Sequence, residues 1–199
     1  STNDTVTILA NGLAENNEIN SEDENYKKFL EALNALNKIM AMKIAADGEG
    51  ASRLVECTVK GAKDIETARG LAKEIIRSNL VKAAMFGKDA NCGRILCAMG
   101  YSGFEFNPDK TCVYFSSIDS AKRYFDVPED GQVKIASDNF IEVVHDGVGL
   151  SFDEEKAEKI LSSEAIEVFV TLEDGQATAQ AWGCDLTYDY VKINGDYRS

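Results

Sequence analysis

The sequence predicts an α+β protein, because helical and strand patterns both recur along the chain. Apolar residues return every three or four positions in residues 26–44 and 64–78, as on one face of a helix. They alternate with other residues in 55–59 and 166–172, as on one face of a strand. The composition, 44% hydrophobic and 28% charged residues in 199, is that of a globular protein with a sizeable core.

The first part of the chain predicts a strand followed by a long helix. Residues 5–10 alternate as a strand and run into Asn11 and Gly12, a turn signal. Ser21 and Glu24 have the spacing of a capping box at a helix start. The helix should be amphipathic and end near Gly48, and its apolar residues recur at helical spacing at Tyr26, Leu30, Leu33, Leu36, Met40 and Ile44.

A strand and two helices are expected next. The strand carries Val55, Cys57 and Val59 on one face. Asp64 can cap a helix that ends at Ser78, with a buried stripe of Ile65, Ala68, Ala72 and Ile75. Residues 80–86 are apolar, and their type stays open. Asp89 can cap a further helix that carries Ile95, Leu96 and Met99 and ends at Gly100.

The second half of the chain predicts mostly strands. Strands are expected at 112–116, 132–136 and 140–144, separated by a short segment at 120–125 and a turn at 128–131. A helix at 153–162 precedes a strand that carries Ile166, Val168, Val170 and Leu172. Asp174 and Gly175 predict a hairpin turn to a partner strand that ends near Gly183, and Asp185 can cap a last helix that carries Leu186, Tyr190 and Ile193.

Charge and hydropathy restrict the partners. The net charge of −13, from 34 acidic against 21 basic residues, argues against nucleic acid and anionic membrane surfaces and leaves small zwitterionic or cationic metabolites. No apolar run approaches the roughly 20 residues that span a bilayer, and the N-terminus lacks the profile of a secretory signal. We therefore expect a cytoplasmic protein.

The cysteines predict neither a disulfide framework nor a metal site. Five cysteines are scattered without a Cys-x-x-Cys pair, and His145 is the single imidazole. Cys92 and Cys97 could meet on neighbouring helical turns, but a metal would need more donors. His145 precedes Asp146 and Gly147, so a solvated turn histidine is favoured over a catalytic relay.

Glu49 is the residue whose surroundings point to ligand binding. It lies between Gly48 and Gly50, whose small size would let a ligand reach the carboxylate, and that charge could pair with an ammonium group. The lysine and hydroxyl residue of a phosphate loop do not follow. From the residues alone, the competing interpretation that Glu49 caps or solvates a turn is favoured.

Four segments resemble the ornithine acetyltransferase (ArgJ) family of arginine biosynthesis: Ser-Thr-Asn-Asp-Thr at the start, Asp-Gly-Glu-Gly-Ala at 47–51, residues 87–103, and the aromatic-rich end at 182–199. The resemblance implies an α+β sandwich of mixed sheets and helices, similar to DmpA and ArgJ. It divides the chain into a helix and sheet part of the β-chain core at 1–106, a strand-rich insertion at 107–148, and a C-terminal helix, hairpin and docking tail at 149–199.

The resemblance also implies an activity and its residues. Family members move an acetyl group from N-acetylornithine to glutamate through an acetyl-threonine intermediate, without a metal or cofactor, and some also accept acetyl-coenzyme A. Their substrate contacts correspond to Glu49, Asn194 and Ser199, where serine replaces the family's threonine. The nucleophilic threonine is expected upstream of Ser1, so no catalytic residue is expected in this chain, and the 199 residues alone should be inactive. Cys92 stands where the family usually has tryptophan.

The resemblance implies partners, and two rival functions stay open. The expected partners are the α-chain of the same precursor and a second copy of that heterodimer, in a heterotetramer. One rival is a self-processing hydrolase with Ser1 as an N-terminal nucleophile. The other is a non-enzymatic amino-acid-binding module in which Glu49 pairs with a ligand ammonium group.

Overall fold

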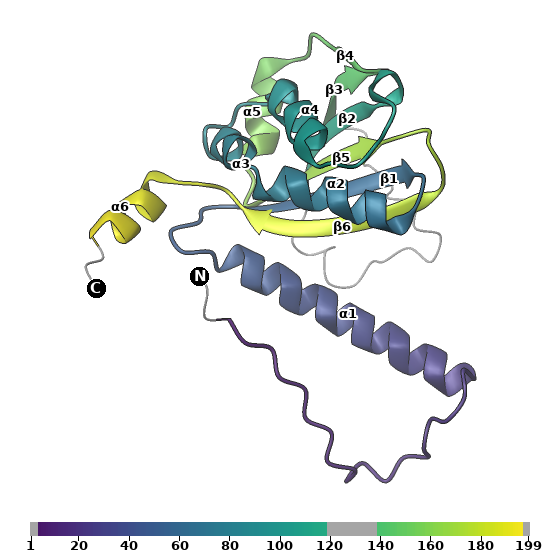
Figure 1. Ribbon diagram of the computed structural model, residues 1–199. Coiled ribbons are helices and arrows are strands. Elements are labelled where there is room, and N and C mark those ends of the chain that lie inside the picture. The colour runs from purple at the N-terminus through teal and green to yellow at the C-terminus, as the bar shows by residue number, and fades with distance from the viewer. Residues whose placement is uncertain (1–3, 119–138, 197–199) are drawn as a thin grey trace.

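The computed structural model describes residues 4–118 and 139–196, which fold around one mixed sheet of six strands (Figure 1). The strand order is β4-β3-β2-β5-β1-β6, and the pair β1 and β5 is parallel whereas the other pairs are antiparallel. The strands are β1 (Leu54–Ala62), β2 (Cys112–Ser117), β3 (Phe140–His145), β4 (Val148–Gly149), β5 (Ala165–Thr171) and β6 (Ala177–Cys184). This mixed architecture confirms the predicted α+β class.

Six α-helices accompany the sheet in the described part of the chain. They are α1 (Glu24–Ala46), α2 (Ile65–Arg77), α3 (Asn79–Phe86), α4 (Cys92–Tyr101), α5 (Glu154–Leu161) and α6 (Tyr188–Asp196), with a 3₁₀ turn at Pro108–Lys110. None of these helices is both long and apolar enough to cross a membrane. Residues 80–86, whose type the sequence left open, belong to α3 and are helical.

The main core lies on one face of the sheet. Strand alternation sends Val55, Cys57 and Val59 of β1 to this face, together with Val168 and Val170 of β5, and all five are buried. Helices α2 to α5 supply buried side chains to the same core, among them Leu71, Ile75, Met85, Ile95, Met99 and Leu161. The buried stripe of α2 forms as predicted except for Ile65, which is exposed.

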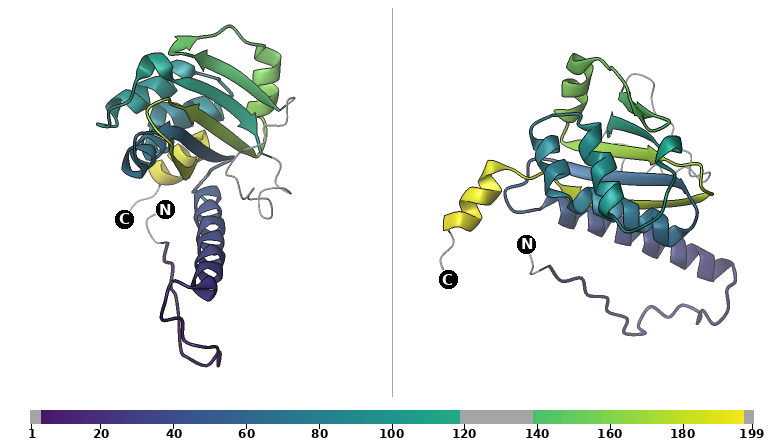
Figure 2. Two further views of the ribbon diagram at one scale, coloured as in Figure 1. Left: turned by 90° about the vertical axis from the view of Figure 1, so that its right-hand side faces the viewer. Right: turned by 45° about the horizontal axis from the view of Figure 1, so that its top comes forward.

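The other face of the sheet carries α1 (Figure 2). Met42 is the buried residue of α1, and it packs with Leu54 and Ala165. Next to this contact, the buried carboxylate of Glu167 accepts hydrogen bonds from the hydroxyls of Thr58 at 2.7 Å and Ser116 at 3.2 Å. Hydrogen bonding of this kind is what allows polar groups to remain inside a protein.

Glu56 extends this polar layer toward α1. Its carboxylate accepts hydrogen bonds from Gln180 Nε2 at 2.7 Å and Trp182 Nε1 at 2.8 Å. Lys38 of α1 donates to Gln180 Oε1 at 2.8 Å and lies 5.6 Å from the centre of the Trp182 ring. The contact between α1 and the sheet is thus part apolar and part hydrogen-bonded.

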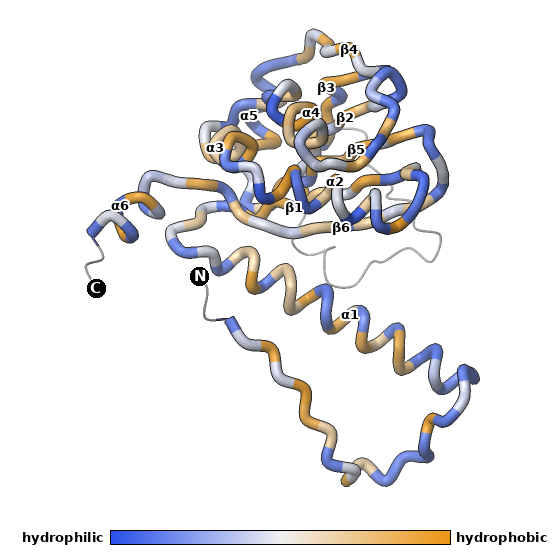
Figure 3. The backbone as a smooth tube through the Cα atoms, viewed as in Figure 1, coloured by the Kyte–Doolittle hydropathy of each residue, from blue (hydrophilic) through white to orange (hydrophobic). Residues whose placement is uncertain are grey.

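The long helix predicted from residues 26–44 is confirmed as α1, but much of its apolar face is exposed, and the predicted N-terminal strand is wrong. Leu36 is 55% exposed and Leu9 is 90% exposed, and residues 5–10 form no strand (Figure 3). A strand needs a neighbour that accepts its backbone hydrogen bonds, and no described strand pairs with this segment. The apolar pattern is present in both segments, but what would cover it is not among the described residues.

The predicted hairpin between β5 and β6 is also wrong. Both strands pair with β1, which lies between them, parallel to β5 and antiparallel to β6. The connection instead passes over the end of β1, where the backbone N–H groups of Asp174 and Gly175 donate to the carbonyl of Gly61. A turn signal predicts a reversal of direction, but it does not say which strand becomes the neighbour.

The caps of α1 and α4 each lie two residues after the predicted cap. Asp23, rather than Ser21, caps α1 by accepting from the N–H groups of Asn25 and Tyr26. Asn91, rather than Asp89, caps α4. In both cases the polar residue directly before the first helical residue is the one that reaches the free N–H groups.

The segment 107–148 takes part in the main sheet. Its strand β2 pairs with β5 on one side and with β3 on the other, so it is an inner strand. The predicted strand at 132–136, the segment 120–125 and the turn 128–131 lie outside the described residues. Whether 107–148 is an insertion relative to the family stays a prediction.

The buried position of Glu167 predicts a pH-dependent effect of the change Glu167→Gln. Burial, and to a smaller degree the nearby Glu56 carboxylate, raises the pKa of Glu167 above its ordinary value of 4.5, so the folded state binds this proton more tightly than the unfolded state. That contribution is complete at pH values below 4.5 and is lost as the pH rises through the folded-state pKa. Relative to the native chain, Glu167→Gln should therefore gain stability between pH 4 and pH 8.

Urea unfolding at several pH values measures this difference in unfolding free energy. The matched control is Glu173→Gln, a carboxylate with 67% of its side chain exposed, which should show little change in slope. Parallel pH dependence of Glu167→Gln and the native chain would contradict the assignment.

Candidate functional site

The loop between α1 and β1 holds Glu49 between two glycines that make close contacts with the chain. A Cβ atom on Gly48 would lie 2.5 Å from Cys184 Sγ, and one on Gly50 would lie 2.7 Å from the backbone nitrogen of Tyr190. Gly50 also has a positive φ of +67°. The glycines thus let the loop approach the end of β6 and the start of α6. The predicted reason, access for a ligand, is not needed to explain them.

Glu49 and Asn194 lie in direct contact although 145 residues separate them in the sequence. Asn194 Nδ2 donates to Glu49 Oε2 at 2.8 Å and to the carbonyl of Tyr190 at 2.9 Å. Both side chains are exposed in this chain. The structure therefore brings together two of the three predicted substrate contacts, whereas Ser199 lies outside the described residues. Their role in binding stays a prediction.

Thr187 joins α6 to the Glu49 loop. Its hydroxyl donates to the carbonyl of Gly50 at 2.6 Å and accepts from the N–H of Tyr190 at 3.2 Å. This single side chain satisfies one free N–H at the helix start and fixes the helix to the loop. Thr187, rather than the predicted Asp185, is the residue that caps the last helix.

The side chain of Asp185 is buried and links the end of β6 to the segment before β1. Its carboxylate accepts from the backbone N–H groups of Ser52 at 2.8 Å and Arg53 at 3.1 Å, and from the Ser52 hydroxyl. Arg53 Nη1 lies 3.4 Å from Asp185 Oδ2, and the Asp185 side chain is fully buried. With these donors occupying its oxygens, Asp185 is not available to cap α6.

A cavity of about 290 Å³ opens beside Glu49. Its lining includes one side chain that the sequence reasoning missed, Lys82 of α3, which is half-buried and forms no ion pair among the described residues. A signal was present, because Lys82 is the single charged residue in the apolar segment 80–86. The lining residues are Gly48, Glu49, Asn79, Lys82, Cys184, Asp185, Leu186 and Tyr190.

The cavity is suited to binding an amino acid. It presents the carboxylate of Glu49 and the ammonium group of Lys82, which are complementary to the two charges of a zwitterion. Its described lining contains no serine or threonine, and Tyr190 contributes a phenol hydroxyl. A larger hollow of about 530 Å³ runs along α2 beside Phe104, but neither Glu49 nor Asn194 lines it. The smaller cavity is therefore the candidate site.

The fold and this cavity define the class: a mixed α+β protein with a small, charged, amino-acid-sized pocket between a glycine-flanked glutamate loop and the C-terminal helix. Comparison with known proteins gives the particular family. The sequence model of the ArgJ family matches residues 1–199, and the chain belongs to that family. This confirms the resemblance on which Glu49, Asn194 and Ser199 were selected.

Individual relatives agree. The arginine biosynthesis bifunctional protein ArgJ 1 of Clostridium acetobutylicum is 47% identical over all of this chain and 44% of its own length. The bifunctional protein ArgJ of Thermotoga neapolitana is 43% identical over all of this chain and 45% of its own length. The crystal structure of the bifunctional protein ArgJ from Bacillus halodurans superposes with a TM-score of 0.81 at 39% identity, covering 99% of this chain and 82% of that one. The chain thus spans less than half the length of these two curated relatives.

The contact between Gly50 and Tyr190 predicts that Gly50→Ala loosens α6. The added methyl group would overlap the Tyr190 nitrogen, and the positive φ costs a non-glycine residue about 1 to 2 kcal/mol. Hydrogen exchange of the α6 amides should become faster.

Gly103→Ala is the matched control. Gly103 has a similar φ of +76°, but an added Cβ would meet nothing within 4 Å. It should carry the backbone cost without releasing α6. Equal α6 exchange in both variants would show that the Gly50 contact does not hold the helix.

Proposed function

We propose that this chain forms the substrate-binding part of a bifunctional acetyltransferase of arginine biosynthesis, which acts as glutamate N-acetyltransferase and ornithine acetyltransferase. The observation that carries the proposal is the direct contact of Glu49 with Asn194 at the edge of a cavity that also contains Lys82. Membership of the ArgJ family, whose curated relatives are named arginine biosynthesis bifunctional proteins, supports the same conclusion.

The reaction is a two-step acyl transfer. A threonine hydroxyl attacks the acetyl carbonyl of N-acetylornithine, the amide C–N bond breaks, and ornithine leaves with a proton on its amine. The amine of glutamate then attacks the acetyl ester, which gives N-acetylglutamate and regenerates the threonine. This scheme requires no metal or cofactor, and acetyl-coenzyme A could replace N-acetylornithine as the donor. The threonine and the donors that stabilise the oxyanion would come from polypeptide outside these 199 residues.

Within this scheme the present residues bind and orient the substrate. N-acetylornithine keeps one free ammonium group and one carboxylate, and glutamate also carries an α-carboxylate. Glu49 would pair with the ammonium group, Lys82 with the shared carboxylate, and Asn194 would hold the Glu49 carboxylate in place while Ser199 adds a hydroxyl. Glu49 would act on the side-chain ammonium group, distant from the reacting carbonyl, whereas Lys82 would hold the carboxylate next to the carbon that carries the acetamido group.

The expected ion-pair energy and the cavity volume indicate that the pocket needs a partner chain to bind substrate tightly. An ion pair between exposed groups is worth about 0.2 to 1 kcal/mol, and Glu49 is exposed in this chain. A cavity of about 290 Å³ lies at the lower limit of ligand sites, which are usually about 300 to 1,000 Å³. Isolated, the chain should bind ornithine weakly and catalyse nothing.

The partner would be the α-chain of the same precursor, within a cytoplasmic heterotetramer. Support comes from the 44% of the Clostridium relative that the chain spans and from the exposed apolar residues of its first helix and N-terminal segment (Figure 3). These residues would be buried by such a partner: Val6, Ile8, Leu9, Leu13, Phe29 and Leu36.

Of the two rivals, the amino-acid-binding module is favoured by the absence of a serine or threonine from the described lining. Calorimetry separates it from our proposal, because a self-sufficient module would bind ornithine tightly as the isolated chain. The hydrolase would depend on Ser1, which lies outside the described residues. Labelling of Ser1 by an acylating probe would support it.

In the complete enzyme, Glu49→Gln should raise the KM for N-acetylornithine and lower kcat/KM about 10- to 100-fold. The change keeps the size of the side chain and an oxygen for Asn194, but it removes the charge, and a hydrogen bond to a charged group is worth about 1.5 to 3 kcal/mol. Steady-state kinetics with both substrates measures the effect.

Glu105→Gln, at a side chain 96% exposed and outside the cavity, is the control and should leave the kinetics unchanged. Unaltered kcat/KM in Glu49→Gln would remove Glu49 from the binding site. Mass spectrometry of the complete enzyme should still detect acetyl-threonine in Glu49→Gln, because the nucleophile is separate from Glu49.

A further inference from the structure

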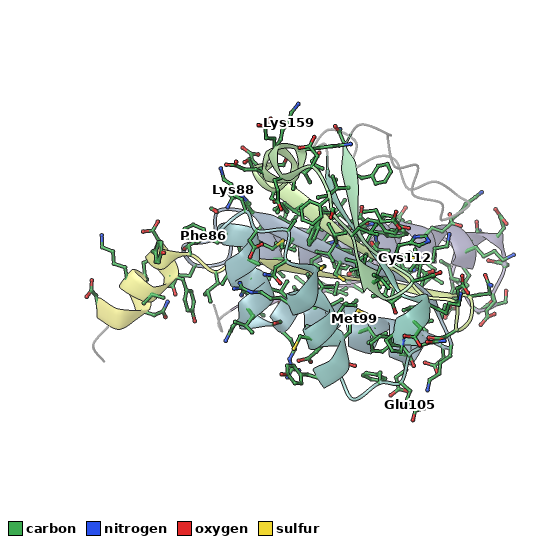
Figure 4. The ribbon with its side chains drawn as sticks, turned by 90° about the horizontal axis from the view of Figure 1, so that it is seen from above. Phe86, Lys88, Met99, Glu105, Cys112 and Lys159 are labelled. Atoms are coloured by element: carbon green, nitrogen blue, oxygen red, sulfur yellow. The ribbon has the colours of Figure 1, made fainter. Side chains whose placement is uncertain are left out.

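A second cluster of reactive side chains lies on β2 and β3, at the opposite end of the sheet from α6 (Figures 1 and 4). His145 Nδ1 lies 2.7 Å from Glu142 Oε1 and 3.9 Å from Cys112 Sγ. One ligand atom from each of the three residues lies within 4.8 Å of both others. None of them lines the cavity beside Glu49.

A β-bulge puts the three side chains on one face of the sheet. Residues three apart on a regular strand point to opposite faces, so Glu142 and His145 should diverge. The register between β2 and β3 shifts where Val113 faces Val144 and Tyr114 faces Glu142, and Val143 and Val144 are both buried. The extra residue restores the alternation, so Glu142 and His145 share the face that carries Cys112.

The position of Cys112 in this cluster is fixed by the strands on either side of it. Cys112 is 9% exposed, and its strand is hydrogen-bonded to β5 on one side and to β3 on the other. The side chains of Glu142 and His145 are 29% and 59% exposed, so they can rotate. A ligand would therefore meet one fixed donor and two adjustable donors.

We propose that Cys112, Glu142 and His145 bind one zinc ion, with water as the fourth ligand. Thiolate, imidazole and carboxylate are the three side-chain ligands that zinc takes in proteins, usually in a tetrahedron. Bonds of about 2.0 to 2.3 Å place such ligand atoms about 3.3 to 3.8 Å apart. The 3.9 Å and 2.7 Å separations of the metal-free cluster lie on either side of this range, and rotation of His145 and Glu142 adjusts both.

Tyr114, which borders Cys112 and Glu142, has a pKa raised chiefly by burial and stays neutral, so it adds no charge to the cluster.

The charges around the cluster do not oppose a cation. Asp146 adds a second carboxylate near His145 and favours positive charge there. Lys110 opposes it, but its ammonium group lies 3.8 Å from both Asp146 Oδ2 and Glu173 Oε2, which offset its charge. On β5, the residue opposite Cys112 is the uncharged Thr171.

Titration of the chain with Co²⁺ tests the ligand set directly, because a thiolate bound to Co²⁺ gives a charge-transfer absorption and tetrahedral Co²⁺ gives intense visible bands. We expect one equivalent of Co²⁺ to bind with both features, and Zn²⁺ to displace it. Mg²⁺, which prefers oxygen ligands, should not compete.

Cys112→Ser and His145→Gln should each lose the spectrum, with circular dichroism confirming the fold. Cys97→Ser is the matched control, since Cys97 is an exposed thiol outside the cluster, and it should retain the spectrum. Glu142→Gln, on the more exposed strand β3, should weaken binding at least tenfold without disturbing Cys112. A native chain that binds no stoichiometric metal, or a Cys112→Ser chain that keeps the thiolate band, would overturn the proposal.

Discussion

The buried carboxylate of Asp185 is the interaction on which the candidate site depends. It ties the segment after β6 to the segment before β1 through Ser52 and Arg53, and both walls of the cavity are attached to this junction. Leaving a buried charge unpaired costs about 3 to 5 kcal/mol. The hydrogen bond between Glu49 and Asn194 is exposed, so solvent weakens it. The junction therefore positions Glu49 and Asn194, whose mutual contact is weak enough to be exchanged for another partner.

The two faces of the sheet explain why α2 is firmly held while α1 is not. The face toward α2 is filled by aliphatic side chains that are almost completely buried, whereas the face toward α1 carries hydrogen-bonded carboxylates, Glu56 and Glu167. Burial of apolar area contributes about 25 cal/mol per Å², and α1 buries one residue completely, Met42. Helix α1 has 23 residues, little buried surface and several exposed apolar side chains. We therefore expect further polypeptide to pack against it.

Local signals in the sequence predicted local structure well. The Asp64 cap of α2 accepts from Thr67 as the pattern requires, and Val55, Cys57 and Val59 of β1 lie together in the core, although Glu56 and Thr58 on the opposite face are buried too. Long-range features were beyond those signals. The Asp174 turn was mistaken for a hairpin because β1 enters between its strands, and Asp185 was assigned to a helix cap because its partners lie 132 and 133 residues earlier. Glu49 and Asn194 were selected by family resemblance, whereas Lys82 needed the fold to place it in the cavity.

The charges within the cavity compensate one another, which supports the proposed binding of amino acids even though the overall charge argues against it. A chain with a net charge of −13 should repel an anionic amino acid such as glutamate. The carboxylate of Asp185, however, is neutralised by Arg53 and by two backbone N–H groups, so it contributes little to the field in the cavity. The remaining charges on the lining are Glu49 and Lys82, one of each sign. A lining that is locally neutral but dipolar fits the proposed role, in which an acetylated donor and an amino-acid acceptor would in turn present a carboxylate to the same lysine.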